Sequence, residues 1–149
     1  MSDTFGRLLA GHLTPGVYRW ASRWSTARLA ARAQREGWRC FVVEGWAIND
    51  KASLLAACAG ACGFPAYFGH NWDALLDMLR DLSWAPTERG YLLIWNASRC
   101  LAWCSPHDFD VALDVLREAV AFWSPTDTPM TVLLRGAARS AEAVPRLRG

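Results

Sequence analysis

The chain has 149 residues, of which 52% are apolar and 20% are charged, and its formal net charge is +2. This length suits one domain with its own apolar core, and the composition excludes an intrinsically disordered or collagen-like chain. No run of 18 apolar residues is present, and the first residues lack the basic and apolar segments of a secretory signal. We therefore expect neither a membrane span nor export.

The first third of the chain predicts a strand, a helix and a second strand. The elements in order are a turn at 15–16, an extended segment at 17–20, a helix at 27–36 and a strand at 38–44. Ser25 or Thr26 is placed to cap the helix. The alternative for this stretch is one long amphipathic helix that runs through Trp20 and Trp24.

The rest of the chain continues to alternate helices with strands. The expected elements are helices at 51–61 and 71–82, a strand at 91–95, a helix from 106 to about 123 and a strand at 130–134. Parallel strands need crossover connections, which helices supply, so this order predicts an α/β fold with a small parallel sheet. We expect residues 1–37 to be an N-terminal extension packed on a domain at 38–135, and residues 136–149 to be a loose Ala/Arg-rich tail.

The net charge hides an acidic body between two basic ends. Residues 1–39 carry a net charge of +5, residues 40–137 carry −5 and residues 138–149 carry +2. An acidic surface attracts a cationic partner and speeds its encounter. Segment charges of this size also occur on ordinary solvated surfaces, so charge alone does not distinguish a binding surface from a solvated one.

Five cysteines include two pairs at a four-residue spacing, Cys58 with Cys62 and Cys100 with Cys104. On a helix either pair would face one way, which permits a zinc site. The Ala-rich surroundings of the first pair favour small apolar core residues instead. The odd number of cysteines and the lack of an export signal predict a reducing cytoplasm. We expect no metal and no cofactor.

The predicted helix at 71–82 separates apolar and acidic side chains. On a helical wheel that advances 100° per residue, the leucines and Trp72 form one apolar stripe. Three carboxylates lie almost opposite this stripe, and we call them the acid ridge: Asp73, Asp77 and Asp81. Like charges four residues apart destabilise a helix by about 0.2–0.5 kcal/mol per pair. The acid ridge is therefore mildly unfavourable alone and would be relieved by a cationic surface. The alternative is a solvated helix face.

Residues 65–70, Pro-Ala-Tyr-Phe-Gly-His, form a predicted loop directly before this helix. Pro65 and Gly69 favour a tight turn, and Gly69 lets the backbone of a partner approach closely. Tyr67 is the better candidate for an exposed contact, whereas Phe68 is expected to cover the core. Asn71 is placed as the N-cap of the helix.

The run at residues 64–79 reads Phe-Pro-x-Tyr-Phe-Gly-x-Asn-Trp-Asp-Ala-Leu-x-Asp-x-Leu. This run resembles the signature of the barstar family, which are intracellular protein inhibitors of barnase-type ribonucleases. Weaker similarity extends from about residue 40 to residue 134 and takes in Trp95, residues 116–119 and the strand at 130–134. The first 37 residues and the tail have no counterpart in the small inhibitor that names the family.

The resemblance implies an inhibitor, not an enzyme, whose acidic helix enters the active site of a basic ribonuclease in place of substrate phosphate. It implies that Tyr67 covers the mouth of that active site and that Asp77 inserts deepest. The implied contact residues are Tyr67, Gly69, His70, Asp73, Leu76, Asp77 and Glu118. Leu76 replaces a Trp of the naming inhibitor, and His70 replaces an acid. These departures leave open a different basic ribonuclease or another cationic protein as the partner.

Three other functions compete with this interpretation. An enzyme could use His70, Asp73 and Asp77 for a metal or for proton transfer, but no further His is placed to complete a site. A nucleic-acid binder could use the arginines and tryptophans of residues 19–39, although an Arg-rich helix with packed Trp is the more ordinary interpretation. The runner-up is an adaptor that keeps the barstar fold and binds a non-nuclease partner.

Overall fold

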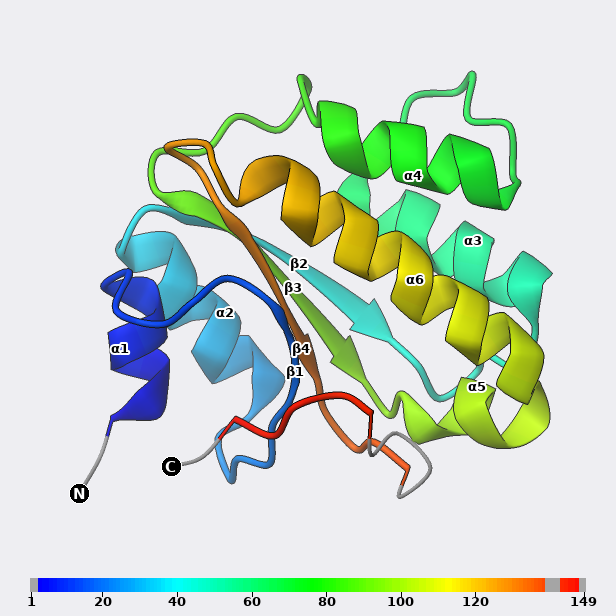
Figure 1. Ribbon diagram of the computed structural model, residues 1–149, viewed down its shortest axis with the longest axis horizontal. Helices are drawn as coiled ribbons and strands as arrows, with labels where there is room; N and C mark the ends of the chain where they lie inside the picture. Colours follow the sequence, from blue (N-terminus) through cyan, green and yellow to red (C-terminus); the bar gives the residue numbers. More distant parts are fainter. Residues whose placement is uncertain (1–2, 139–142, 148–149) are drawn as a thin grey trace.

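The computed structural model describes residues 3–138 and 143–147 of the chain. The strands are β1 (Val17–Arg19), β2 (Trp38–Glu44), β3 (Gly90–Asn96) and β4 (Met130–Leu134). The helices are α1 (Thr4–Leu9), α2 (Thr26–Arg35), α3 (Lys51–Cys62), α4 (Trp72–Asp81), α5 (Arg99–Cys104) and α6 (Pro106–Trp123). The strands form one sheet in the order β1-β4-β3-β2, with every neighbouring pair parallel (Figure 1). This confirms the expected α/β fold with a parallel sheet.

The order β1–α2–β2 confirms the predicted strand–helix–strand unit, and the alternative of one long N-terminal helix is wrong. Ser25 is the N-cap of α2, where its side chain accepts a hydrogen bond from the backbone N–H of Arg28. Two six-residue helices, α1 and α5, were not predicted. They are too short to show a hydrophobic period, which is the main sequence signal for a helix.

Consecutive strands β1 and β2 lie at opposite edges of the sheet. The connection from β1 to β2 crosses the sheet in one direction, and the steps from β2 to β3 and from β3 to β4 go in the other. Because such crossovers are almost always right-handed, opposite directions place their helices on opposite faces. Accordingly, α1 and α2 cover one face, and α3, α4 and α6 cover the other (Figure 1).

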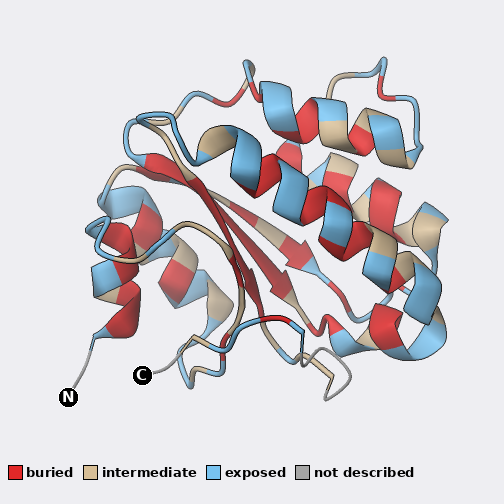
Figure 2. Cartoon of the chain, in the orientation of Figure 1, coloured by how far each residue is buried: buried red, intermediate tan, exposed pale blue. Residues whose placement is uncertain are grey.

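The central strand β3 contributes to the core on both faces of the sheet. Tyr91, Leu93 and Trp95 pack in the larger core under α3, α4 and α6, while Leu92 and Ile94 pack in the smaller core under α1 and α2. The strands are therefore mostly buried, as expected for a parallel sheet that helices cover on both faces (Figure 2). None of the described helices is both long and apolar enough to cross a membrane.

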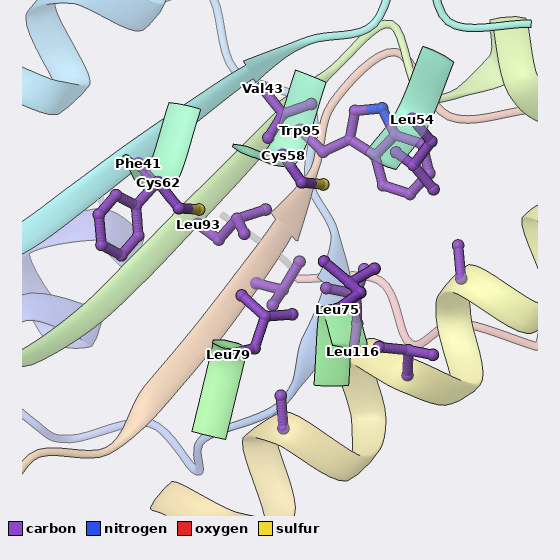
Figure 3. Packing of buried hydrophobic residues seen from close by; sticks show 14 of the residues in the cluster. Phe41, Val43, Leu54, Cys58, Cys62, Leu75, Leu79, Leu93, Trp95 and Leu116 are labelled. Carbon is purple, nitrogen blue, oxygen red and sulfur yellow. The ribbon is translucent and has the colours of Figure 1, made fainter. Parts of the chain in front are cut away.

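Cys58 and Cys62 of α3 lie in the larger core beside Phe41 and Leu93 (Figure 3). Burial raises the pKa of the Cys58 thiol to about 12 and holds the pKa of the Cys62 thiol well above its ordinary value. Both thiols are therefore neutral at pH 7 and act as small apolar residues, as predicted for this pair. Within the described residues, no group of three or more His, Cys, Asp or Glu is placed to hold a metal ion.

The tryptophans of the N-terminal segment are structural. Trp20 stacks on Phe5 with 5.5 Å between ring centroids, and the Trp38 Nε1–H donates to the Leu9 carbonyl at 2.9 Å. Both indoles are buried, so neither is available to stack on a nucleic-acid base. Trp24 is more exposed, but the Arg28 guanidinium lies 4.1 Å from the centre of its ring.

The expectation of a loose tail is wrong for residues 143–147. Arg19 of β1 donates its backbone N–H to the Pro145 carbonyl at 2.8 Å, and its carbonyl accepts from the Leu147 N–H at 2.7 Å. Val144 is completely buried. The reason is that β1 is an edge strand, whose outward backbone groups need partners that the tail supplies. Of the rest of the expected tail, residues 136–138 are described, with the Gly136 carbonyl accepting from the Arg99 N–H at 3.0 Å. Residues 139–142 and 148–149 lie outside the described residues.

Candidate functional site

The loop between α3 and α4 begins where Gly63 ends α3 in the left-handed conformation. Its turn is closed by the Phe68 N–H, which donates to the Pro65 carbonyl at 3.0 Å. Phe68 is buried and packs edge-on against Phe64, with 4.9 Å between ring centroids. Tyr67 is 70% exposed. The loop therefore anchors one ring in the core, as expected, and presents the neighbouring ring to solvent.

His70, rather than a glycine, takes the left-handed backbone conformation in this loop, with φ of 51°. Its Nδ1 lies 3.0 Å from the Phe68 carbonyl oxygen, and its ring lies over the Phe68 ring at 4.7 Å. Gly69 packs closely against the start of α4, since a Cβ there would lie 3.3 Å from the Asn71 Nδ2, a tight contact, and 3.5 Å from the Ala74 Cβ, an ordinary one. These contacts fix the path of the loop into α4.

Asn71 is the N-cap of α4, as predicted. Its Oδ1 accepts a hydrogen bond from the Ala74 N–H at 2.7 Å, and its Nδ2 reaches the Gly69 carbonyl at 3.3 Å. The first bond satisfies a backbone donor at the start of the helix, and the second holds the loop against it. The same side chain therefore orients both parts of the candidate site.

We expect Asn71→Ala to lower the free energy of unfolding by about 1 kcal/mol, the usual cost of losing an N-cap. Asn71→Asp keeps the acceptor and adds a charge that the helix N-terminus favours, so it should cost much less. Urea denaturation of the two variants checks the difference. Equal losses would show that the cap bond does not hold the start of α4.

The three carboxylates of the acid ridge are all exposed on α4, while Leu75, Met78 and Leu79 are buried on its other side. One basic side chain lies among them. Arg80 donates from its Nη2 to the Asp77 Oδ1 at 3.1 Å, and both side chains are largely solvated. This ion pair was not predicted, although the three-residue spacing of Asp77 and Arg80 is visible in the sequence.

Helix α6 extends the acidic surface beside α4. Glu118 is exposed on it, and so are two carboxylates that the sequence analysis did not single out, Asp110 and Asp114. Their four-residue spacing was the signal that could have found them. The two helices are tied together near their C-terminal ends by the Trp123 Nε1–H, which donates to the Leu79 carbonyl at 2.8 Å.

Leu76 is half-buried on α4 and packs against the larger core. It therefore offers a partner less apolar contact than a fully exposed residue would. Trp72, at the start of the helix, is also half-buried, and the Lys51 Nζ lies 5.8 Å from the centre of its ring. Together, the exposed loop and the outer sides of α4 and α6 make a rigid acidic surface that is suited to binding a cationic partner.

Residues 38–135 match the family model described as Barstar (barnase inhibitor). This match spans well over half of the chain and includes the exposed loop, α4 and α6. The chain belongs to the barstar family. The match confirms the resemblance that the sequence run at 64–79 indicated, and α1, β1 and α2 lie outside it. A comparison with curated proteins found no matching relative.

Proposed function

We propose that this barstar-family protein inhibits a basic ribonuclease by inserting α4 and the loop before it into the active site of the nuclease. The observation that carries the proposal is the exposed acid ridge, which lies within the segment that matches a family of barnase inhibitors. In this role the carboxylates stand in for substrate phosphates. The protein is then not an enzyme and acts in the cytoplasm, where it protects cellular RNA.

The electrostatics of the surface support this proposal. The outer sides of α4 and α6 carry six exposed carboxylates and two exposed arginines, a net formal charge of −4 on a chain whose total is +2. A concentration of negative charge of this kind steers a basic protein toward the correct face and raises the association rate. Because the side chains project from a packed helix, little freedom is lost when they bind.

Each contact residue has a proposed role. Tyr67 covers the mouth of the nuclease active site, and Gly69 lets the nuclease backbone approach the loop. Asp77 inserts deepest among the basic groups of the active site, with Asp73 beside it. Glu118 makes a peripheral contact from α6.

Asp77 must exchange its Arg80 partner for a cation of the nuclease. We therefore expect Arg80→Ala to tighten binding by about 2- to 5-fold, since exposed ion pairs are worth up to about 1 kcal/mol. Isothermal titration at low and high salt checks this, and the gain should shrink as salt screens the charges. Arg117→Ala is the control, because Arg117 pairs with Asp114 on α6 at 3.6 Å. Weaker binding by Arg80→Ala would mean that Arg80 itself contacts the nuclease.

The proposal is tested by titrating the purified chain into a barnase-type ribonuclease while RNA cleavage is followed. Cleavage should fall to zero near a one-to-one molar ratio, as expected for a tight inhibitor of the active site. The assay is repeated on several small basic ribonucleases, because the departures at His70 and Leu76 alter the match to any one of them. Unchanged cleavage by every ribonuclease at large molar excess would contradict the proposal.

The second candidate function is an adaptor that uses the same surface to bind a cationic protein other than a nuclease. Two observations favour it. Leu76, which replaces a Trp of the naming inhibitor, is half-buried, and His70 places a hydrogen-bonded ring where that inhibitor has an acid. An adaptor would bind its partner through the acid ridge without affecting RNA cleavage, so the titration separates the two functions.

A further inference from the structure

A second surface, unrelated to the acid ridge, lies at the carboxyl ends of the parallel strands. The loop after β2, helix α5 and residues 137–138 surround an open groove of about 1130 Å³. Trp46 and Trp103 line it and are 67% and 86% exposed. Trp103 is the most exposed large apolar side chain in the described part of the chain. Apolar surface gathered in this way marks an interaction site.

The walls of the groove are held firmly. Ile48 and Ala102 are buried at its base. The Arg99 guanidinium lies over the Trp46 ring, 4.7 Å from its centre, and the Arg99 N–H donates to the Gly136 carbonyl at 3.0 Å. The base of the groove and its Trp46 wall are thus held in place before any partner arrives, which limits the cost of ordering them on binding.

The groove also lies away from the surface that binds the nuclease in the proposed function. Helix α6 separates α5 from α4 (Figure 1), and the carboxylates of the acid ridge are exposed on α4. A partner in the groove would therefore leave the acid ridge free. Nothing in the proposed role of α4 explains why two indole rings are exposed here.

We propose that the groove binds a second copy of this chain in a twofold dimer, with Trp103 of each copy inserted into the groove of the other. A twofold interface needs a surface that is complementary to itself. This surface has that property, because a projecting indole stands at the rim of the groove that it helps to line.

The charge of the groove and the area of its exposed rings are compatible with a second copy of the chain as the occupant. Arg99 is the only charged side chain that lines the groove within the described residues, so a twofold pairing brings few like charges together. In the adjoining crevice, Glu44 lies with Arg99 and Arg135. A net charge of +2 gives little repulsion between copies. The exposed parts of the two indoles amount to about 300–400 Å² per copy, roughly half of what each partner of a standard interface buries. Burial of these rings alone falls short of a standard interface, which predicts a weak, reversible dimer.

The test is the molar mass of the full chain, measured by light scattering and sedimentation from about 1 µM to 1 mM. The wild type should rise toward twice the monomer mass and stop there. Trp103→Ala should raise the dimer dissociation constant by at least about 30-fold, as expected when a central aromatic contact is removed. Phe122→Ala is the matched control, because Phe122 is an exposed aromatic on α6 outside the groove, and it should change the constant less than 2-fold.

Three results would overturn the proposal. A wild type that stays monomeric to 1 mM would show that the groove holds something other than a second copy. A dimer unaffected by Trp103→Ala would place the interface elsewhere. Masses that grow past two copies would contradict the twofold arrangement, because head-to-tail contacts propagate instead of closing. The ribonuclease titration is independent of all three results.

Discussion

Replacing Asp77 by Ala is expected to weaken binding to a basic ribonuclease by about 30- to 5,000-fold. This range corresponds to about 2–5 kcal/mol, the usual loss when one partner of a buried charged pair is removed at an interface, for which the barnase–barstar pair is itself a source. Asp77 lies in the middle of the exposed side of α4, so a nuclease that covers this helix would bury it. In the complex with the Asp77→Ala variant, the cation of the nuclease that pairs with Asp77 would be buried without a partner.

The matched control is Asp81→Ala, one helical turn further along. Asp81 is an exposed member of the acid ridge at the end of α4. Replacing it by Ala removes one negative charge from the surface, as Asp77→Ala does. It should weaken binding less than about 5-fold, as for a charge at the rim of an interface. Dissociation constants for both variants, measured at the same salt concentration, give the comparison. Small and equal effects would contradict the insertion of Asp77.

The second large effect is expected in the core beneath the acid ridge. Leu79→Ala should lower the free energy of unfolding by about 2–5 kcal/mol, since it removes a fully buried side chain and leaves a cavity. Leu79 joins α4 to the larger core, and its carbonyl accepts the hydrogen bond from Trp123 of α6. For a domain with a total stability of about 5–15 kcal/mol, this loss is a large fraction.

Leu76→Ala provides the comparison for this core prediction. Leu76 lies on the same helix but is only half-buried, so its truncation should cost about 1 kcal/mol or less. Urea denaturation of the two variants, with the denaturant slope checked for each, gives the two losses. If Leu79→Ala cost no more than Leu76→Ala, the packing of α4 on the core would be different from the one described. Nuclease binding by both variants is measured where they are fully folded, so that lost stability is not mistaken for lost contacts.

The elements with strong local signals could be predicted from the sequence. The bounds of α6 and β4 follow from Pro106 at the helix start and from a short apolar run between turn residues. The N-cap at Asn71 and the two sides of α4 follow from local patterns as well. The exposed Tyr67 beside the buried Phe68 was expected on general grounds of residue type.

The features that depend on distant parts of the chain could not be predicted in this way. The tail pairs with Arg19, which is more than 120 residues away along the chain. The position of β1 beside β4, at the far edge from β2, likewise depends on the path of the whole chain. The groove beside Trp46 and Trp103 appears only when the segments that follow β2, β3 and β4 meet at one end of the sheet. The local periodicity of apolar residues carries no information about contacts between segments that are distant in the sequence.

In the proposed complex, the acid ridge occupies the phosphate site of the ribonuclease. The most direct measurement is a competition titration, in which a ribonuclease that binds this chain is first saturated with a nucleoside monophosphate that fills its active site. We expect the apparent dissociation constant of the chain to rise in proportion to the nucleotide concentration, because both ligands need the same cationic groups. An affinity that does not change at saturating nucleotide would place the chain elsewhere on the nuclease and would contradict the insertion of α4 into the active site.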